Sequence, residues 1–100
     1  MSMEVTIAEN HVLVVLSGNV SEEEADRIKE ILKKNIADEG TIYHMDFSKV
    51  DNISRDGISV LTVMQKLALN KFSSFIIKGL SGEVKIRFEL LQMGKMFEIH

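Results

Sequence analysis

Three aspartates in the middle of the chain have the residue type that could hold a divalent cation. Asp46, Asp51 and Asp56 recur at even intervals, where the pattern predicts the end of a strand and the start of a helix. Carboxylate oxygens are the ligands that Mg²⁺ prefers, and phosphoryl-transfer proteins use such clusters. A receiver-type domain would also need an acidic pair after its first strand, but Glu9-Asn10-His11 follows that strand here. We therefore expect no metal at these aspartates, and an Asp-based phosphoryl-transfer enzyme is the less favoured alternative.

Two of these aspartates have simpler structural explanations. A carboxylate at a strand end accepts hydrogen bonds from nearby backbone N–H groups, which is the role expected for Asp46. An acid in the first turn of a helix interacts favourably with the positive end of the helix dipole, which is the role expected for Asp56.

The three histidines form no recognisable ligand or catalytic motif. His11, His44 and His100 are far apart in the sequence, and none has another histidine at ligand spacing. The sequence has no cysteine, so thiolate metal sites, thiol nucleophiles and disulfides are excluded. It also lacks the His-Glu-x-x-His, Gly-x-Ser-x-Gly and phosphate-binding glycine-loop motifs. We predict that the protein is not an enzyme, with no catalytic residue, no bound metal and no cofactor.

Ser54 is the remaining side chain that could accept a chemical group. It precedes a predicted helix, where a phosphate would meet free backbone N–H groups and the positive end of the dipole. A serine at this place also acts as a helix N-cap, which contributes about 1 kcal/mol. We favour the cap and keep Ser54 as a possible displaced phosphoacceptor.

The composition is that of a soluble globular domain. The 100 residues are 45% hydrophobic and 27% charged, with a net charge of −3 and with acids and bases mixed along the chain. Nucleic-acid binding needs a basic face, so the sequence does not predict it. Residues 1–4 do not resemble a signal peptide, and the longest apolar run is far shorter than the roughly 20 residues of a membrane helix. We expect one domain over residues 1–100, in the cytoplasm and without membrane binding.

The first part of the chain predicts a hairpin followed by an amphipathic helix. Residues 4–8 alternate apolar and polar side chains, and residues 11–17 are nearly continuously apolar, so both are predicted strands. Ser21 with Glu24 three residues later forms a capping box for a helix over 22–37.

Strands and helices alternate in the rest of the chain. Residues 41–47 predict a third strand, followed by a short loop over 48–53 and a second helix over 55–70. A fourth strand is predicted over 72–78 and a short last strand over 96–99. The second helix has more apolar residues than one core-facing stripe requires. This excess could pack inside the domain, or it could bind a partner or a second copy of the chain.

The segment over residues 82–93 fits two structures. Its apolar and charged side chains alternate, as in a strand. Ser81 as an N-terminal cap and Gly94 as a C-terminal stop fit a helix. The order β-β-α-β-α-β-(α or β)-β indicates an α/β domain with a mixed sheet.

Three segments, taken in order, resemble the STAS domain of the anti-sigma-factor antagonist family. Residues 16–21 resemble its passage from hairpin to first helix, and 79–99 resemble its third helix, glycine stop and closing segment. Residues 45–61 resemble its central motif, a strand ending in Asp-Leu-Ser and a short loop leading to Asp-Ser-Ser-Gly-Leu at a helix start. The resemblance implies a STAS-like mixed sheet of about four to five strands flanked by helices, and it favours helix for 82–93.

The sequence departs from that family at the motif's centre. The family's Asp falls on Ser54, the serine phosphorylated by a partner kinase falls on Arg55, and the next serine falls on Asp56, while the glycine matches Gly57. An arginine cannot accept a phosphoryl group, so the resemblance implies the fold without the usual switch.

The function that the resemblance implies is a bacterial regulatory module of signal transduction and transcription regulation, which binds a protein partner. The partner would be an anti-sigma factor or a related kinase-like regulator, docked through the loop and helix start at 48–57. A scaffold subunit of a signalling assembly, without its own switch, is the alternative, and the chain could form a homodimer. The residues expected at the partner-binding surface are Asp51, Asn52, Ser54, Arg55, Asp56 and Gly57.

Overall fold

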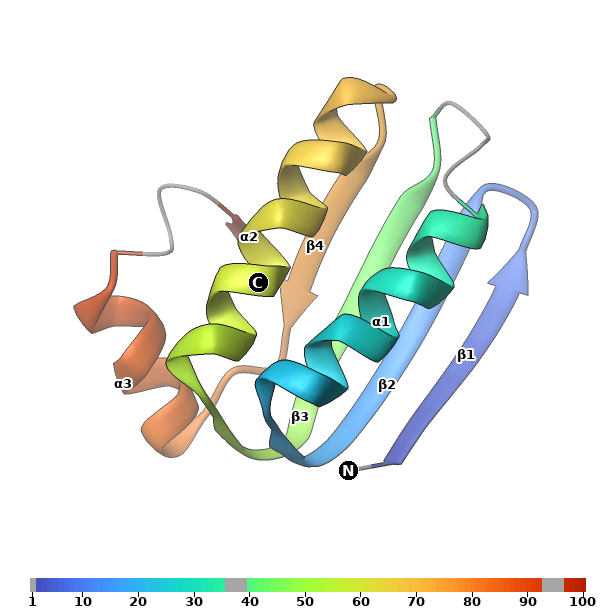
Figure 1. The fold of residues 1–100 in the computed structure, drawn as a ribbon. Helices are drawn as coiled ribbons and strands as arrows, with labels where there is room; N and C mark the ends of the chain where they lie inside the picture. The colour runs from blue at the N-terminus through green and yellow to red at the C-terminus, as the bar shows by residue number, and fades with distance from the viewer. Residues whose placement is uncertain (1, 36–39, 93–96) are drawn as a thin grey trace.

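The computed structural model describes residues 2–35, 40–92 and 97–100, which form a mixed α/β domain (Figure 1). Its five strands make one sheet in the order β1-β2-β3-β4-β5, with β1 antiparallel to β2 and the other neighbours parallel. This confirms the fold class predicted from the sequence. The elements are β1 (Ser2–Ala8), β2 (His11–Val20), α1 (Glu22–Asn35), β3 (Ile42–Ile53), α2 (Arg55–Asn70), β4 (Ser74–Lys78), α3 (Gly82–Leu90) and β5 (Glu98–Ile99).

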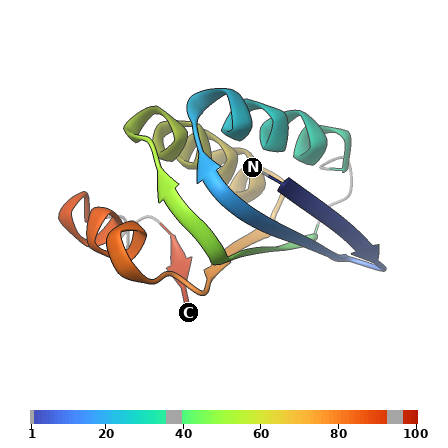
Figure 2. The same ribbon diagram turned by 90° about the horizontal axis from the view of Figure 1, so that it is seen from below.

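The helices are distributed unequally around the sheet. Helices α1 and α2 lie side by side on one face, and α3 lies at the side of the sheet where β5 is found (Figure 1, Figure 2). Successive residues of a strand point to opposite faces, so alternate side chains are buried under α1 and α2. The other face has no helix over it among the described residues, and we call it the open face. The fully buried side chains of the central strands include Val14, Leu16, Tyr43, Met45 and Ile77.

Aromatic contacts fix α3 against the sheet. The ring of Phe88 lies 6.1 Å from that of Phe47 in β3 and 6.2 Å from that of Phe97, measured between centroids. Phe88 and Val84 are the buried residues of α3. Because they are four residues apart, they lie on one side of the helix and hold that side to the core.

The predicted loop over 48–53 is wrong, because β3 continues through these residues to Ile53. Strand β2 also continues beyond the predicted end, to Val20, and the two strands remain paired as far as Val20 and Ile53. Two register shifts in this stretch bend the strands, and Gly18 there has a φ of 85° that favours glycine. The sequence suggests a loop because this irregular pairing breaks the simple alternation of apolar residues.

The segment over 82–93 is helical from Gly82 to Leu90. This agrees with the helix that the family resemblance implied and not with the strand that the alternation suggested. The alternating residue Ile86 is 54% exposed, so the alternation does not mark a buried face. The described part of the segment leaves the helix at Leu91, earlier than predicted, and residue 93 and Gly94 lie outside the described residues. The same holds for residues 36–37 of the first predicted helix and for residue 96 of the last predicted strand.

Candidate functional site

The candidate site lies where two parallel strands end and two helices begin. Val20 and Ile53 are the last residues of β2 and β3 and are register partners. Helix α1 starts at Glu22 and helix α2 at Arg55, so both helix N-termini lie at this edge of the sheet. Open α/β sheets bind ligands just outside the carboxyl ends of their strands, and this edge is therefore the first place to look for function.

Ser54 caps helix α2, as expected from the sequence. Its Oγ accepts a hydrogen bond of 2.9 Å from the backbone N–H of Gly57, and its own N–H donates to the carbonyl of Val20 over 2.9 Å. The residue is half-buried. Its side chain and its backbone therefore both help to seat the start of α2 on the end of β2.

Gly57 lies where the first turn of α2 passes over β2, and it is buried. A Cβ atom at this position would lie 2.9 Å from the Val20 carbonyl oxygen and 3.2 Å from Cγ1 of Ile53. Such a contact with a backbone oxygen is shorter than real Cβ atoms allow, so the backbone would have to shift. The close approach within the domain explains the glycine, which the sequence left open between this reason and contact with a partner.

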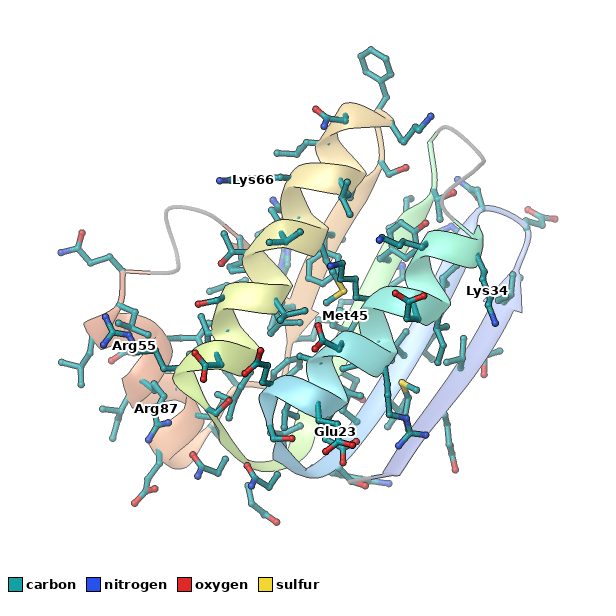
Figure 3. All side chains as sticks on the ribbon, viewed as in Figure 1. Glu23, Lys34, Met45, Arg55, Lys66 and Arg87 are labelled. Atoms are coloured by element: carbon teal, nitrogen blue, oxygen red, sulfur yellow. The ribbon has the colours of Figure 1, made fainter. Side chains whose placement is uncertain are left out.

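Arg55 and Asp56 are exposed, in contrast to the residues on either side of them. They are the first two residues of α2, and Asp56 is an acid in its first turn. A negative charge there is favourable for the helix dipole. The side chain of Arg55 extends toward α3, where Arg87 lies at the same corner of the molecule (Figure 3).

A shallow groove joins the start of α2 to α3. Arg55, Arg87, Leu90 and Leu91 line it, and its volume is about 340 Å³. Arg87 is half-buried, and its Nη1 donates a hydrogen bond to the carbonyl of Ile53 at the end of β3. This anchored guanidinium ties α3 to the same strand end that carries Ser54. Sequence reasoning did not find Arg87, because its place beside the motif depends on how α3 packs.

Asp51 and Asn52, near the end of β3, have unequal exposure. Asp51 is exposed, whereas Asn52 is half-buried and its Oδ1 accepts a hydrogen bond of 2.9 Å from the N–H of Ile53. Asn52 therefore satisfies the irregular backbone at the end of β3, and only Asp51 of this pair presents its side chain to solvent.

Comparison with known proteins identifies the family to which this fold and motif belong. The model of the STAS domain family matches residues 2–100. The chain belongs to the STAS domain family. No curated protein sequence shows a significant match to it.

Solved structures with the same fold are distant in sequence. A putative anti-sigma factor antagonist from Thermotoga maritima has a TM-score of 0.79 at 14% identity, over 97% of this chain and 84% of that chain. The anti-sigma factor antagonist SpoIIAA in its unphosphorylated form has a TM-score of 0.77 at 14% identity, over 99% and 87%. A sulfate transporter family protein from Wolinella succinogenes has a TM-score of 0.75 at 15% identity, over 94% and 79%. At these identities the likeness shows the shared STAS fold, and function must be argued from the site.

The three aspartates of this STAS domain do not converge. The described residues contain no group of three or more histidine, aspartate or glutamate side chains that could hold a metal ion. Asp46 accepts a hydrogen bond of 2.9 Å from the N–H of Ser48. This bond and a second from the Ser48 side chain lower the pKa of Asp46, with smaller contributions from Lys49 and Lys78, while burial opposes them. Asp46 therefore has the backbone-binding role expected from the sequence.

Two histidines that the sequence separates lie together on the open face of the STAS sheet. Nδ1 of His11 is 3.1 Å from Nε2 of His44, although the two residues are far apart in the sequence. Burial, then the charges of Lys78 and His11, lowers the pKa of His44. His100 lies instead by Glu98, with 3.6 Å between Nε2 and Oε2. Only the parallel pairing of β2 with β3 brings the two histidines together, and the sequence does not specify that register.

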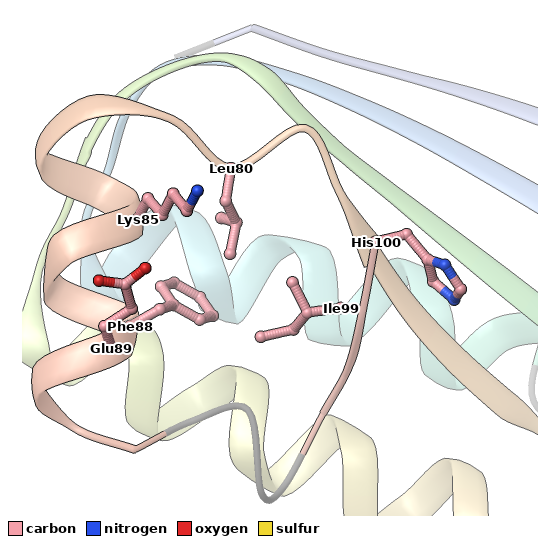
Figure 4. Close-up of a pocket in the computed structure, with 6 residues that line it drawn as sticks. All are labelled: Leu80, Lys85, Phe88, Glu89, Ile99 and His100. Atoms are coloured by element: carbon pink, nitrogen blue, oxygen red, sulfur yellow. The ribbon is translucent and has the colours of Figure 1, made fainter.

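A second hollow lies between α3 and the end of the chain at Ile99 and His100 (Figure 4). It has a volume of about 290 Å³ and an apolar floor that includes Phe88 and Ile99, with Lys85 and Glu89 along α3. Phe88 is fully buried and Ile99 packs against the core, so this floor is an edge of the core.

The apolar excess on α2 is divided between the core and solvent. The helix buries Ile58, Leu61, Met64 and Ala68, but Val63 and Leu69 are 45% and 59% exposed. No helix in the described part of the chain is long and apolar enough to cross a membrane.

Proposed function

We propose that this STAS domain is a regulatory module of the anti-sigma-factor antagonist type, which binds a protein partner and performs no catalysis. The observation that carries the proposal is the exposed apolar surface of α3 beside Arg55. Leu90 is 78% exposed and lines the groove with Leu91 and the two arginines. A contiguous apolar patch rimmed by arginine is typical of an interaction site. We call Arg55, Ile86, Arg87, Leu90 and Leu91 the docking surface.

The chemistry of the docking surface defines the partner that would fit it. Two guanidinium groups line the groove between α2 and α3, and no carboxylate is among its lining residues. Arginine binds carboxylates through two parallel hydrogen bonds, and it also stacks on apolar and aromatic groups. The partner should therefore present an aspartate or glutamate surrounded by apolar side chains. Glu83 lines the neighbouring groove and would help to orient the partner by repelling a second acid.

The proposed docking is not switched by phosphorylation at position 55. SpoIIAA is among the similar structures in both an unphosphorylated and a phosphorylated form. The motif aligns the phosphorylated serine of the family with Arg55, whose guanidinium cannot accept a phosphoryl group. Ser54 already accepts a hydrogen bond from Gly57 and is half-buried, which supports a capping role over that of a displaced phosphoacceptor. We infer that a fixed positive charge replaces the switch.

A scaffold subunit of a signalling assembly is the second candidate. Val63 and Leu69 of α2 are exposed outside the docking surface and would serve a second contact, with another protein or with another copy of the chain. In both cases the proposal places the protein in the cytoplasm of a bacterium, in signal transduction that regulates transcription. Sedimentation equilibrium of the purified chain distinguishes a homodimer from a monomer.

Charge reversal at Arg55 tests the docking surface. The tagged chain is used to co-purify its partner from the source cells, and calorimetry at low salt then compares wild type, Arg55→Glu and Lys66→Glu. Lys66 is exposed on the same helix, away from α3 (Figure 3). We expect Arg55→Glu to lower the affinity by about tenfold or more, because it opposes the partner's carboxylate, while Lys66→Glu has little effect. The difference should shrink at high salt.

The opposite result has a definite meaning. If the partner binds Arg55→Glu and the wild type with equal affinity at low salt, the start of α2 is not the interface. The scaffold function, with contacts through other surfaces such as Val63 and Leu69, would then replace the proposal.

A further inference from the structure

The open face of the sheet carries a pair of imidazoles that the docking surface does not use. His11 begins β2, and His44 lies near the start of β3. They are neighbours because the parallel register pairs His11 with Ile42 and Leu13 with His44. The pair lies at the amino ends of these strands and the docking surface at their carboxyl ends. Along the length of β2 this is a separation of about 30 Å.

The two rings have the spacing of a chelating pair. Nδ1 of His11 and Nε2 of His44 are 3.1 Å apart, and the ring planes are within 17° of parallel. For a cation with bonds of about 2.0–2.1 Å to both nitrogens, the N–metal–N angle would be about 95–100°. That angle lies between the right angle of square-planar or octahedral coordination and the wider angle of a tetrahedron. In this contact one nitrogen donates its proton to the other. A cation would replace that shared proton, and both surface side chains would have to rotate until their lone pairs point at it.

The backbone around the pair is already held in place. The N–H of Ile42 donates to the carbonyl of Asn10 over 2.7 Å, and Nδ2 of Asn10 donates to the carbonyl of Gly40 over 3.3 Å. These bonds connect the turn before β2 to the start of β3. A ligand that bridges the two histidines would therefore not have to order the strands, which lowers the entropic cost of binding.

We propose that His11 and His44 form a two-imidazole binding site for a divalent late transition metal: copper, nickel or zinc. Imidazole nitrogen is a preferred ligand of these ions, whereas Mg²⁺ and Ca²⁺ prefer oxygen. Water completes the coordination, because only two protein ligands converge here. Cu²⁺ should bind more tightly than Ni²⁺ or Zn²⁺, following the general order of affinities for divalent ions. Lys78 on the neighbouring strand places a positive charge near His44 and moderates the affinity.

Calorimetric titration of the untagged chain tests the site directly. Cu²⁺, Zn²⁺ and Mg²⁺ are titrated into wild type, His11→Ala, His44→Ala and His100→Ala. We expect one equivalent of Cu²⁺ and no Mg²⁺ binding. Either His11→Ala or His44→Ala should lower the Cu²⁺ affinity by about tenfold or more, because the second imidazole binds intramolecularly. His100→Ala is the matched control and should bind like the wild type.

Non-additivity and spectroscopy complete the test. The loss of Cu²⁺ affinity in the double variant of His11 and His44 should be smaller than the sum of the losses in the two single variants. This is expected if one ion uses both rings, because either single change already removes the two-ring site. Electron paramagnetic resonance of Cu²⁺ on the wild type should show two imidazole nitrogens, and this readout does not depend on the folding of any variant. A spectrum with a single imidazole, or an equal loss of affinity in His100→Ala and His11→Ala, would overturn the proposal.

Discussion

The four residues at the start of α2 divide into an inner pair and an outer pair. Ser54 and Gly57 are turned toward the domain, where one caps the helix and the other passes over the Val20 carbonyl. Arg55 and Asp56 between them are exposed. Residues three apart lie on the same side of a helix. Within this one turn, Ser54 and Gly57 therefore face the domain while Arg55 and Asp56 face solvent. One short motif therefore fixes the fold with its inner residues and leaves its outer residues open to change.

The comparison explains how the domain would keep the STAS fold with the departures from the family's central motif that the sequence resemblance implies. The inner glycine is kept because the neighbouring backbone leaves no room for a side chain. The outer positions contact solvent, so a serine-like residue and an arginine are equally compatible with the fold there. Different residues at positions 55 and 56 are thus expected to change which partner binds and to leave the fold unchanged.

Replacement of Gly57 should give the largest effect. Alanine in place of glycine inside a helix normally adds about 0.5–1 kcal/mol of stability. Here the new Cβ would meet the Val20 oxygen at 2.9 Å, so we expect Gly57→Ala to lower the free energy of unfolding by about 2 kcal/mol. Urea denaturation measures it, with Ser59→Ala on the exposed side of the same helix as the control. A variant more stable than the wild type would show that α2 does not sit tightly on β2.

Replacing Arg87 or Arg55 should change the stability of the protein by different amounts, although both side chains line the same groove. Arg87 donates to the Ile53 carbonyl, and Arg87→Ala leaves that half-buried backbone group without this donor. We expect a loss of about 1–2 kcal/mol for Arg87→Ala. The exposed Arg55 should tolerate alanine within about 0.5 kcal/mol. Equal losses in thermal denaturation would contradict the assignment of Arg87 as the anchor and Arg55 as the contact residue.

The two serine caps offer a comparison of helix starts. Ser54 accepts from the Gly57 N–H over 2.9 Å, whereas Ser21 accepts from the Glu24 N–H over 3.4 Å. We expect Ser54→Ala to cost about 1 kcal/mol and Ser21→Ala to cost less, because the longer bond is weaker. Chemical denaturation of the two variants in parallel decides the order. If Ser21→Ala is the more damaging change, the start of α1 is the better-sealed corner of the sheet.

The sequence predicted the first two helices and most strands because these are consistent with their local pattern, whereas the third helix was predicted from the family resemblance. Capping serines and helical spacing located α1 and α2, alternation located β1, and a short apolar run located β4. The continuation of β3 to Ile53 was missed because its pairing contains register shifts that no local pattern encodes. For the same reason, long-range pairing was needed to place His11 beside His44 and Arg87 beside Ile53. Segments distant in sequence build these features, so only the folded structure shows them.

The aspartates also divide into hydrogen-bonded and exposed side chains. Replacing the hydrogen-bonded Asp46 is expected to change the stability of the protein least. Asp46 accepts a hydrogen bond from the Ser48 N–H, and the pKa of Asp46 lies below its ordinary value of 3.8 chiefly because of this bond. A carboxyl whose pKa is lower in the folded state stabilises the fold when ionised. That contribution is complete above the unfolded pKa and is lost as the pH falls through the folded pKa.

Asp46→Asn keeps an oxygen acceptor but removes the charge, so we expect it to cost less than about 1 kcal/mol at pH 7. The difference from the wild type should be constant at neutral pH. It should narrow as the pH falls below the ordinary pKa of 3.8, where the unfolded chain takes up the proton first, and it should vanish once the pH has fallen through the lower pKa of the folded state. Ser48→Ala is the matched variant, since it removes the weaker side-chain bond and keeps the stronger backbone one. Its loss of stability should therefore be smaller than that of Asp46→Asn, and it should retain most of the acid dependence. If Ser48→Ala instead removed the acid dependence completely, the hydroxyl rather than the backbone N–H would be the group that holds the Asp46 carboxylate.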